Sequence, residues 1–294
     1  MKILFRILFL STCGVIAFYF WWTLYHQIIE KKSPIQIPTW EQIESRTENR
    51  GAICIKNPQV EFFMYHYIRD HDPHDTATTK ELSVAPSLFE AHMQKVESLA
   101  KEKKITLMKW DEFLESLKSG CFPWKNIWIF TADDGWIDMR DSLVPLASKH
   151  EVPFFLGIIT NRLDKGGFLS RDDVMTLAKN PLISIASHSV SHTDNSKLSE
   201  WEETHEMCDS QDTLKKLTWQ KVETYIYPSG RINANIDESV AKKCGYALAW
   251  STSFGTDYND HTGSIYDLNR RRIFSETEPH FYDLVLEKQW AKKR

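Results

Sequence analysis

The sequence contains no block of lysine and arginine residues that could follow a phosphate backbone. Its 36 basic residues are scattered and are outnumbered by 40 aspartates and glutamates, which gives a formal net charge of -4. Proteins that bind nucleic acid concentrate positive charge on one face or along one helix. The sequence also has no internal repeat and no low-complexity segment. We therefore expect a globular protein without a nucleic-acid partner.

Cysteine is scarce, and its spacing lacks the Cys-x-x-Cys pairs that are typical of structural zinc sites. Cys13 lies in an apolar N-terminal run. The other four cysteines could form two disulfides in any of three connectivities; they are Cys54, Cys121, Cys208 and Cys244. Buried free thiols are the alternative.

The N-terminal part has a long run without charged residues. Residues 7–25 form this run of 19 residues, directly after Lys2 and Arg6, and Trp21 and Trp22 lie near its end. Such a run nearly crosses a hydrocarbon core of about 30 Å, and tryptophans at its end are typical of a membrane interface. Because no Ala-x-Ala cleavage site follows, we predict an uncleaved anchor over residues 1–25 with a cytoplasmic N-terminus. A cleaved signal peptide is the alternative, and both predict an exported chain, periplasmic or extracellular.

Residues 26–58 are polar and contain three prolines, as expected of a tether. Residues 59–294 form the predicted catalytic domain, in which apolar strands alternate with helices. The expected strands cover residues 60–68, 127–131, 152–160, 182–186, 222–227 and 246–251, with a further strand at 271–274. Helices are expected after Ser87, Ser170, Ser199 and Asn235 as N-caps, and over residues 111–117 and 139–149. This alternation, with strands apolar on both faces, predicts an α/β fold with a parallel sheet covered by helices.

Polar residues follow three of these strands where each strand ends. They are the pair Asp133 and Asp134, then His188, then Ser229 with Gly230. Catalytic groups gather at this edge in α/β barrels and in open α/β sheets. An exposed Asp-Asp-Gly turn is the alternative for the first group. A buried pair of carboxylates needs solvent, a metal ion or a shared proton to be tolerated.

His188 and His192 lie four residues apart, so one helical turn would place both imidazoles on one face. Two histidines and one carboxylate leave an open position for water on a divalent metal, and zinc fits this ligand set best. One aspartate would ligate the metal, and the other would remain free to take a proton from the water. Chance spacing among 11 histidines is the alternative.

Four segments together resemble the polysaccharide deacetylases, also known as carbohydrate esterase family four or the NodB-homology family. Residues 131–135 are similar to the family's Thr-Phe-Asp-Asp-Gly motif, and residues 188–192 to its His-Ser/Thr-x-x-His motif. Residues 227–230 resemble its Tyr-Pro-Tyr-Gly segment. Residues 64–68 are similar to the Met-Tyr-His-x-Ile strand of the exported, poly-N-acetylglucosamine-deacetylase-like branch. The resemblance extends from about residue 62 to about residue 273.

The resemblance implies a distorted, TIM-like (β/α) barrel that hydrolyses N- or O-acetyl groups on a glycan. Asp133 would be the general base, and the metal ligands would be Asp134, His188 and His192. The metal would polarise the acetyl carbonyl and activate the attacking water. The backbone N–H of Ser229 would stabilise the oxyanion. Arg270 would orient the base, in a register that is uncertain by one residue within the run Arg270-Arg271-Arg272.

Three differences from the family pattern stand out. Ala132 replaces a large aromatic residue, and Ser229 replaces tyrosine. The third difference is that no Leu-x-His motif supplies a general acid, because neither His261 nor His280 has the required flanking residues. For substrate binding we expect Trp136 to stack on a sugar face, beside the segment that contains Tyr227, Pro228 and Gly230.

The leading hypothesis is an anchored, exported, metal-dependent deacetylase that acts on an acetylated polysaccharide. A carbohydrate-binding relative without activity is an alternative that the missing acid motif suggests. Another metallohydrolase on a similar barrel, such as a phosphatase, is a further alternative. The sequence leaves the identity of the glycan open.

Overall fold

The computed structural model describes residues 54–55, 58–252 and 264–287 of the 294-residue chain. All of them belong to one compact unit, residues 37–294. The predicted anchor and nearly all of the predicted tether lie outside the described residues, as does His261. Among the residues described, there is no helix with the length and apolar character needed to span a bilayer.

The described elements follow one another as strand and helix along most of the chain. The strands are β1 (Gln59–Tyr65), β2 (Tyr67–Ile68), β3 (Ser83–Val84), β4 (Thr106–Leu107), β5 (Asn126–Ala132), β6 (Phe154–Ile158), β7 (Ile183–Ser187), β8 (Thr224–Ile226), β9 (Leu248–Ser251), β10 (Leu268–Asn269) and β11 (Arg271–Arg272). The α-helices are α3 (Ala77–Leu82), α4 (Pro86–Lys101), α5 (Trp110–Ser119), α6 (Val144–Lys149), α7 (Arg171–Leu177), α8 (Glu200–Thr204), α9 (Ser210–Thr218), α10 (Asp237–Cys244) and α11 (Phe281–Leu286). Short 3-10 or π segments are η1 (Met139–Leu143), η2 (Thr160–Arg162), η3 (Asn195–Lys197), η4 (His205–Asp209) and η5 (Pro228–Gly230).

Parallel strands form a nearly closed barrel in the order β10-β9-β8-β7-β6-β5-β1-β11, with β4 paired to β5 beside this path. The two ends of the order come from one short segment. Leu268 of β10 pairs with Trp250 of β9, whereas Arg271 of β11 pairs with Phe63 of β1. Residues 268–272 therefore close the sheet, and the predicted (β/α) barrel is confirmed at this level.

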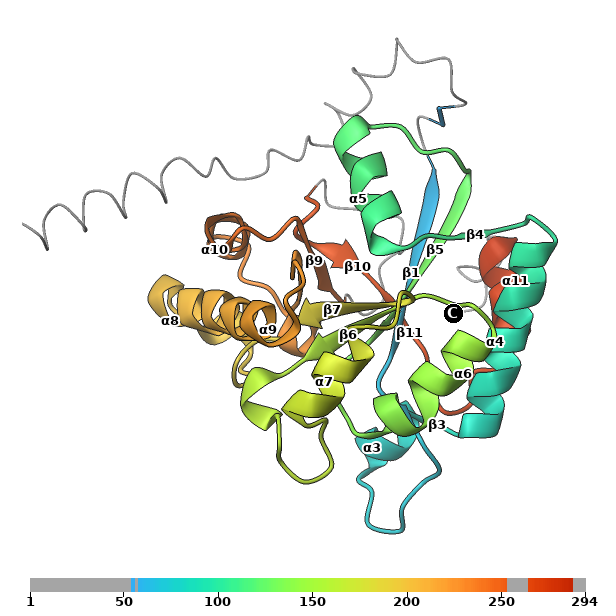
Figure 1. Ribbon diagram of the computed structural model, residues 1–294, viewed down its shortest axis with the longest axis horizontal. Coiled ribbons are helices and arrows are strands. Elements are labelled where there is room, and N and C mark those ends of the chain that lie inside the picture. The colour runs from blue at the N-terminus through green and yellow to red at the C-terminus, as the bar shows by residue number, and fades with distance from the viewer. Residues whose placement is uncertain (1–53, 56–57, 253–263, 288–294) are drawn as a thin grey trace, which may run out of the picture. The chain divides into compact units, whose positions relative to one another are not determined.

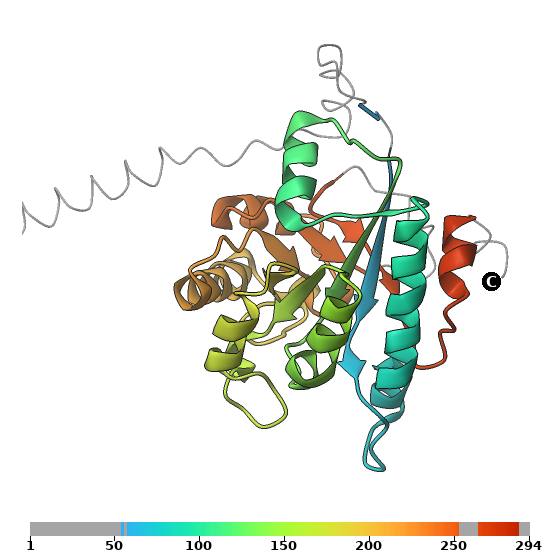
Figure 2. The same ribbon diagram turned by 45° about the vertical axis from the view of Figure 1, so that its right-hand side comes forward.

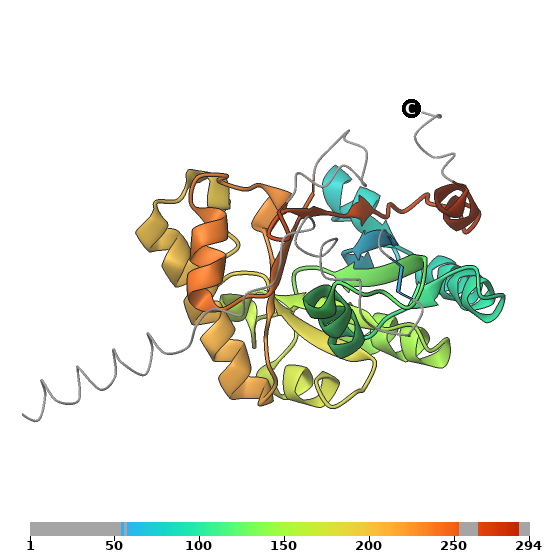
Figure 3. The same ribbon diagram turned by 90° about the horizontal axis from the view of Figure 1, so that it is seen from above.

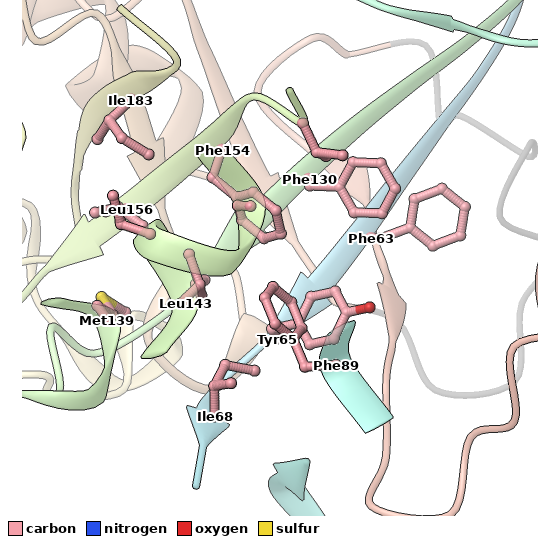
Figure 4. Close-up of a cluster of buried hydrophobic side chains, with 14 of the residues drawn as sticks. Phe63, Tyr65, Ile68, Phe89, Phe130, Met139, Leu143, Phe154, Leu156 and Ile183 are labelled. Carbon is pink, nitrogen blue, oxygen red and sulfur yellow. The ribbon is translucent and has the colours of Figure 1, made fainter. Parts of the chain in front are cut away.

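Helices pack outside the strands, and the strands are buried on both faces. Figure 3 shows the helices of residues 200–244 on one side of the strands and α4 with α11 on the other. Helices α4 and α11 lie side by side (Figure 2), joined by an ion pair of 2.7 Å between Lys95 Nζ and Asp283 Oδ1. One core cluster contains Phe63, Phe130 and Phe154 (Figure 4). Their strand neighbours belong to a second cluster, which explains the apolar runs in the sequence.

The predicted N-caps are partly correct. Ser170 and Ser199 cap α7 and α8, and each forms a capping box with the acidic residue three positions later. In contrast, α4 begins at Pro86 with Ala85 as its N-cap, because proline suits the first helical position. The prediction of Ser87 as a cap is therefore wrong, and Ile236 takes the place predicted for Asn235.

Two disulfides join segments that are distant in the sequence. Cys54 pairs with Cys121 beside the end of α5, and Cys208 of η4 pairs with Cys244 of α10. The structure therefore selects the disulfide interpretation over free thiols, and it selects one of the three connectivities.

Candidate metal centre and active site

Two aspartates leave the barrel at the end of β5. Asp133 extends the strand, since its backbone N–H donates to the carbonyl of Tyr65 over 3.0 Å, and its side chain is buried. Asp134 and Gly135 then turn the chain with φ angles of 81° and 80°. A positive φ is uncommon for any residue other than glycine, so the turn holds Asp134 in a sparsely populated conformation.

His188 follows β7 at the same edge of the sheet and is buried. Its Nδ1 lies 2.8 Å from the carbonyl oxygen of Ile226 in β8. Because that oxygen can only accept, it favours the tautomer with the proton on Nδ1, which leaves the Nε2 lone pair for a metal. Burial would lower the pKa of His188, but Asp134, the charge of Asp133 and the Ile226 carbonyl together outweigh burial and raise this pKa.

His192 reaches the site through a loop and not through the predicted helical turn. Ser189 and His192 have φ angles of 68° and 65°, and the His192 N–H donates to Ser189 Oγ over 2.8 Å. Glu206 of η4 holds the loop: its carboxylate accepts from the backbone N–H groups of Val190 and Ser191 over 2.9 and 2.8 Å. Burial lowers the pKa of His192 to about 4, so its ring is neutral and available as a ligand.

The three predicted metal ligands meet at one point. Asp134 Oδ1 lies 3.3 Å from His188 Nε2 and 3.4 Å from His192 Nε2. One ligand atom from each of the three residues lies within 4.8 Å of the others. Zinc bonds of about 2.1 Å at tetrahedral angles place neighbouring ligand atoms about 3.4 Å apart, so the donor set and its spacing fit this metal.

Asp133 is held by Arg270, which lies between β10 and β11. The guanidinium makes two parallel hydrogen bonds, 2.7 Å to Oδ1 and 2.8 Å to Oδ2 of Asp133. Burial alone would raise the pKa of Asp133, but Arg270 beside it holds this pKa below its usual value. Arg271 points elsewhere and pairs with Glu61 over 2.7 Å. The uncertainty of one residue in the register is thereby resolved in favour of Arg270.

A cavity of about 410 Å³ opens over these groups. It is lined by Met64, His66, Thr78, Leu82, Asp133, Asp134, His188, His192, Ser229, Gly230, Arg231, Thr252, Arg270 and Arg272. Gly230 is required here, because a Cβ atom at this position would lie 2.7 Å from the backbone nitrogen of Thr252. Ser229 beside it has a φ angle of 59°. The cavity joins both aspartates to the loop predicted to stabilise an oxyanion.

His66 is a residue of this cavity to which the sequence analysis assigned no role. It follows β1 and lies on the same strand face as Met64, which also lines the cavity. Its Nδ1 is shielded from solvent and has no hydrogen-bond partner among the described residues. Burial lowers the pKa of His66, although the charges of Asp133 and Asp134 act in the opposite direction.

The expectation that Trp136 stacks on a sugar is wrong. Its indole packs against two other rings, with centroid distances of 4.1 Å to Phe168 and 4.7 Å to Tyr67. Trp136 is also not among the residues that line the cavity. Its Nε1–H instead donates to Asp134 Oδ2 over 2.9 Å.

The assignment of Tyr227 and Pro228 to substrate binding is also contradicted. Both side chains are buried, and neither is among the residues that line the cavity. The Tyr227 ring packs against Tyr225 with a centroid distance of 5.2 Å. Tyr227 and Pro228 are packed in the interior beneath the loop. Only Ser229 and Gly230 of this segment line the cavity.

A protein-family comparison agrees with this geometry. The family model for polysaccharide deacetylases matches residues 123–249, which contain both aspartates and both histidines of the site. The chain carries a polysaccharide deacetylase domain. This deacetylase domain is also similar to YxkH of Bacillus subtilis (strain 168), which is provisionally named as a polysaccharide deacetylase. The two are 25% identical over 238 residues, which cover 79% of this chain and 78% of YxkH.

Solved structures share the barrel of the deacetylase domain. The Streptococcus pyogenes deacetylase PplD, solved in complex with acetate, is 26% identical with a TM-score of 0.68, over 78% of this chain and 99% of PplD. IcaB from Ammonifex degensii is 16% identical with a TM-score of 0.62, over 80% of this chain and 98% of that structure. The second likeness is one of fold alone.

Proposed function

We propose that this protein is a zinc-dependent hydrolase that removes acetyl groups, most simply N-acetyl groups, from an extracellular or cell-envelope polysaccharide. The observation that carries the proposal is the division of roles between neighbouring aspartates. Asp134 lies against His188 and His192, whereas Asp133 is clamped by Arg270. The family match and the likeness to a deacetylase solved with acetate support the same reaction.

The ligands of the metal would be Asp134, His188 and His192. When bound, zinc would polarise the acetyl carbonyl and bring the pKa of a water molecule toward neutrality. Asp133 accepts the proton of the attacking water, since Arg270 keeps this carboxylate ionised and fixes its orientation. Its two oxygens retain lone pairs for this purpose, because each accepts only one of the two guanidinium bonds.

The charge that develops on the carbonyl oxygen needs a donor, and the backbone N–H of Ser229 would supply it. Ser229 lines the cavity on the turn between β8 and α10. Backbone donors fixed in this way stabilise an oxyanion without reorganisation. The serine side chain is not needed for this role, so the replacement of the family's tyrosine leaves the donor in place.

His66 is proposed as the group that protonates the leaving nitrogen. It lines the same cavity as Asp133 and Asp134, and its Nδ1 makes no hydrogen bond within the part of the chain that the structure describes. The proton that Asp133 takes from the water passes through this ring to the amine nitrogen as the C–N bond breaks, which yields acetate and a free amine. The general acid that the family takes from its Leu-x-His motif would here be a histidine that follows the first strand.

The proposed location is outside the cytoplasm, with the domain held at the membrane by residues 1–25. The apolar run in the sequence supports the anchor. The disulfides Cys54–Cys121 and Cys208–Cys244 support export, because such bonds persist in oxidising compartments.

The experiment is to measure acetate release from partly acetylated polysaccharides, among them poly-N-acetylglucosamine and peptidoglycan, with and without a chelator. We expect release to stop with the chelator and to return with Zn²⁺. Asp133→Asn should bind zinc and lower the rate by about 10²–10⁴-fold. His66→Gln should lower the rate without loss of zinc. Acetate release that is unchanged by the chelator, or by Asp133→Asn, would overturn the proposal.

A further inference from the structure

The metal carboxylate is held by an aromatic side chain that comes two residues after it. Asp134 uses Oδ1 toward the two histidines, and its other oxygen, Oδ2, accepts the Nε1–H of Trp136 over 2.9 Å. An aspartate whose second oxygen is occupied in this way presents a single oxygen to a metal. The same hydrogen bond restricts rotation about the side-chain bonds of Asp134. The backbone of Asp134 is also in an uncommon conformation, with φ of 81°.

The indole is in turn fixed by segments from two other parts of the chain. Phe168 stacks on it with planes 23° apart, and Tyr67 lies beside it with planes 31° apart. A cationic side chain lies beside each of these two rings: Arg69 lies 5.0 Å from the Tyr67 ring and Arg162 lies 5.6 Å from the Phe168 ring. We call the row of Tyr67, Trp136 and Phe168 the aromatic stack.

Backbone hydrogen bonds hold the loop with Phe168 in register against Trp136. The N–H of Leu169 donates to the carbonyl of Gly135, and the N–H of Ile137 donates to that of Gly167, each over 2.9 Å. These bonds flank an antiparallel bridge between Trp136 and Phe168. The position of the indole is therefore determined by backbone pairing as well as by ring contacts, so little freedom remains at its Nε1.

From this geometry we infer that Trp136 is a positioning residue for the metal, acting through Asp134. This inference rests on the proposed function, because it concerns the same metal site. The Nε1–H orients Asp134 so that Oδ1 faces His188 and His192 before any metal arrives. Partners of this kind, one step removed from the metal, commonly change metal affinity by about 10–100-fold. The role differs from sugar stacking, since it uses the edge of the indole and not its face.

The test is the affinity of the full-length protein for Zn²⁺, measured by competition with a chelating dye. Trp136→Phe keeps a ring in the aromatic stack and removes the donor. We expect it to weaken Zn²⁺ binding by about 10–100-fold. The visible spectrum of the Co²⁺-substituted protein should also change, because the carboxylate is no longer held to one oxygen. Excess metal should restore most of the acetate release.

Phe168→Leu is the matched control, because it disturbs the stack but keeps the indole N–H. It should weaken Zn²⁺ binding less than Trp136→Phe does. If Trp136→Phe does not fold, placing benzothienylalanine at position 136 replaces the N–H by sulfur within a ring of the same shape. Zn²⁺ affinity within about twofold of wild type in the folded variant, or a larger loss in Phe168→Leu, would overturn the inference.

These outcomes are separate from those that test the proposed function. A wild-type protein that binds Zn²⁺ but releases no acetate contradicts the deacetylase proposal, and the affinity comparison still tests Trp136. A wild-type protein that releases acetate, with unchanged Zn²⁺ affinity in the variant, contradicts the role of Trp136 alone.

Discussion

Two pairs of acidic side chains in the described part of the chain are shielded from water, and their pKa values are shifted in opposite directions. Asp133 and Asp134 lie at the end of β5, one buried and the other partly buried. Glu203 of α8 and Asp237 of α10 are both buried farther along the chain. Removing a carboxylate from water favours its neutral form, so each pair needs a way to limit this cost.

The first pair is kept ionised by separate partners. Burial would raise the pKa of both aspartates. Arg270 instead lowers that of Asp133, and His188 beside Asp134 lowers that of Asp134. Each aspartate therefore remains charged, which suits the proposed roles of one as a proton acceptor and the other as a metal ligand.

The second pair has no such partner. Among the described residues, neither Glu203 nor Asp237 forms an ion pair with a lysine, arginine or histidine within 4.0 Å. Burial raises the pKa of Glu203 above its usual range, Asp237 beside it raises it further, and burial raises that of Asp237 as well. Because the pKa of Glu203 is raised to about 9, its carboxyl is protonated at neutral pH, and the pair carries at most one negative charge. The comparison teaches that partners, and not burial, distinguish a reactive carboxylate from a structural one.

Removing the cation from the first pair should have the largest effect. Arg270→Met leaves Asp133 buried and unpaired, which typically costs about 3–5 kcal/mol of stability. For a domain of this size the thermal midpoint should fall by roughly 10 °C. Acetate release should also fall by more than tenfold at temperatures where the variant is folded. Differential scanning calorimetry and the acetate assay measure the two effects.

Arg271→Met is the control for this variant. Arg271 directly follows Arg270 in the chain and pairs with another buried carboxylate, that of Glu61. It should lose stability to a similar extent and keep the catalytic rate of the folded fraction. If Arg270→Met kept the rate of wild type, the clamp on Asp133 would have no catalytic role.

The sequence alone predicts the chemical groups of the first pair better than their surroundings. Two adjacent aspartates after an apolar strand and two histidines four residues apart are local patterns, and the structure joins Asp134 to both histidines. The predicted helical turn between the histidines is wrong, since positive φ angles at Ser189 and His192 build a loop. Nothing in the histidine spacing distinguishes the two conformations.

Other parts of the site depend on contacts between distant segments. His66 was not assigned because β1 is buried on both faces, so its residue pattern does not reveal which side faces the cavity. Glu206 lies 15 positions after Ser191 and carries no motif. The Trp136 indole packs against the rings of residues 67 and 168, and this could not be inferred from the residues next to it in the sequence.

Neutralising the second pair should have a moderate effect that depends on pH. The pKa of Glu203 is raised in the folded state, so the folded protein holds a proton that the unfolded chain releases near pH 4.5. The stabilisation is complete below that pH and is lost as pH rises toward the raised pKa of the folded state. Glu203→Gln keeps a neutral side chain, so its thermal midpoint should exceed that of wild type by about 3–6 °C at pH 9.

At pH 5 the same variant and the wild-type protein should unfold at nearly equal temperatures, because both carry a neutral side chain at position 203. Glu202→Gln, at an exposed position one residue earlier, is the control and should not show the pH-dependent gain. An equal shift at pH 5 and pH 9 would contradict the raised pKa of Glu203.

Glu206 offers a third arrangement, and altering it should have the smallest effect. Its carboxylate accepts three hydrogen bonds, two of them from the backbone of the His192 loop and one of 2.6 Å from Ser191 Oγ. Glu206→Gln keeps the shape but weakens these charge-assisted bonds. We expect Zn²⁺ affinity to fall by about tenfold or less, measured by dye competition. A loss as large as that of His192→Ala would mean that Glu206 contacts the metal itself.

The closure of the barrel by residues 268–272 has a consequence for the newly made chain. Arg270 lies between β10 and β11, the two ends of the strand order (Figure 1), so Asp133 gains its cationic partner only when these last strands are in place. A chain that had not yet formed these strands would hold both histidines and both aspartates, yet the proposed base would lack its partner. The proposed base thus depends on a side chain that lies 137 positions later in the chain.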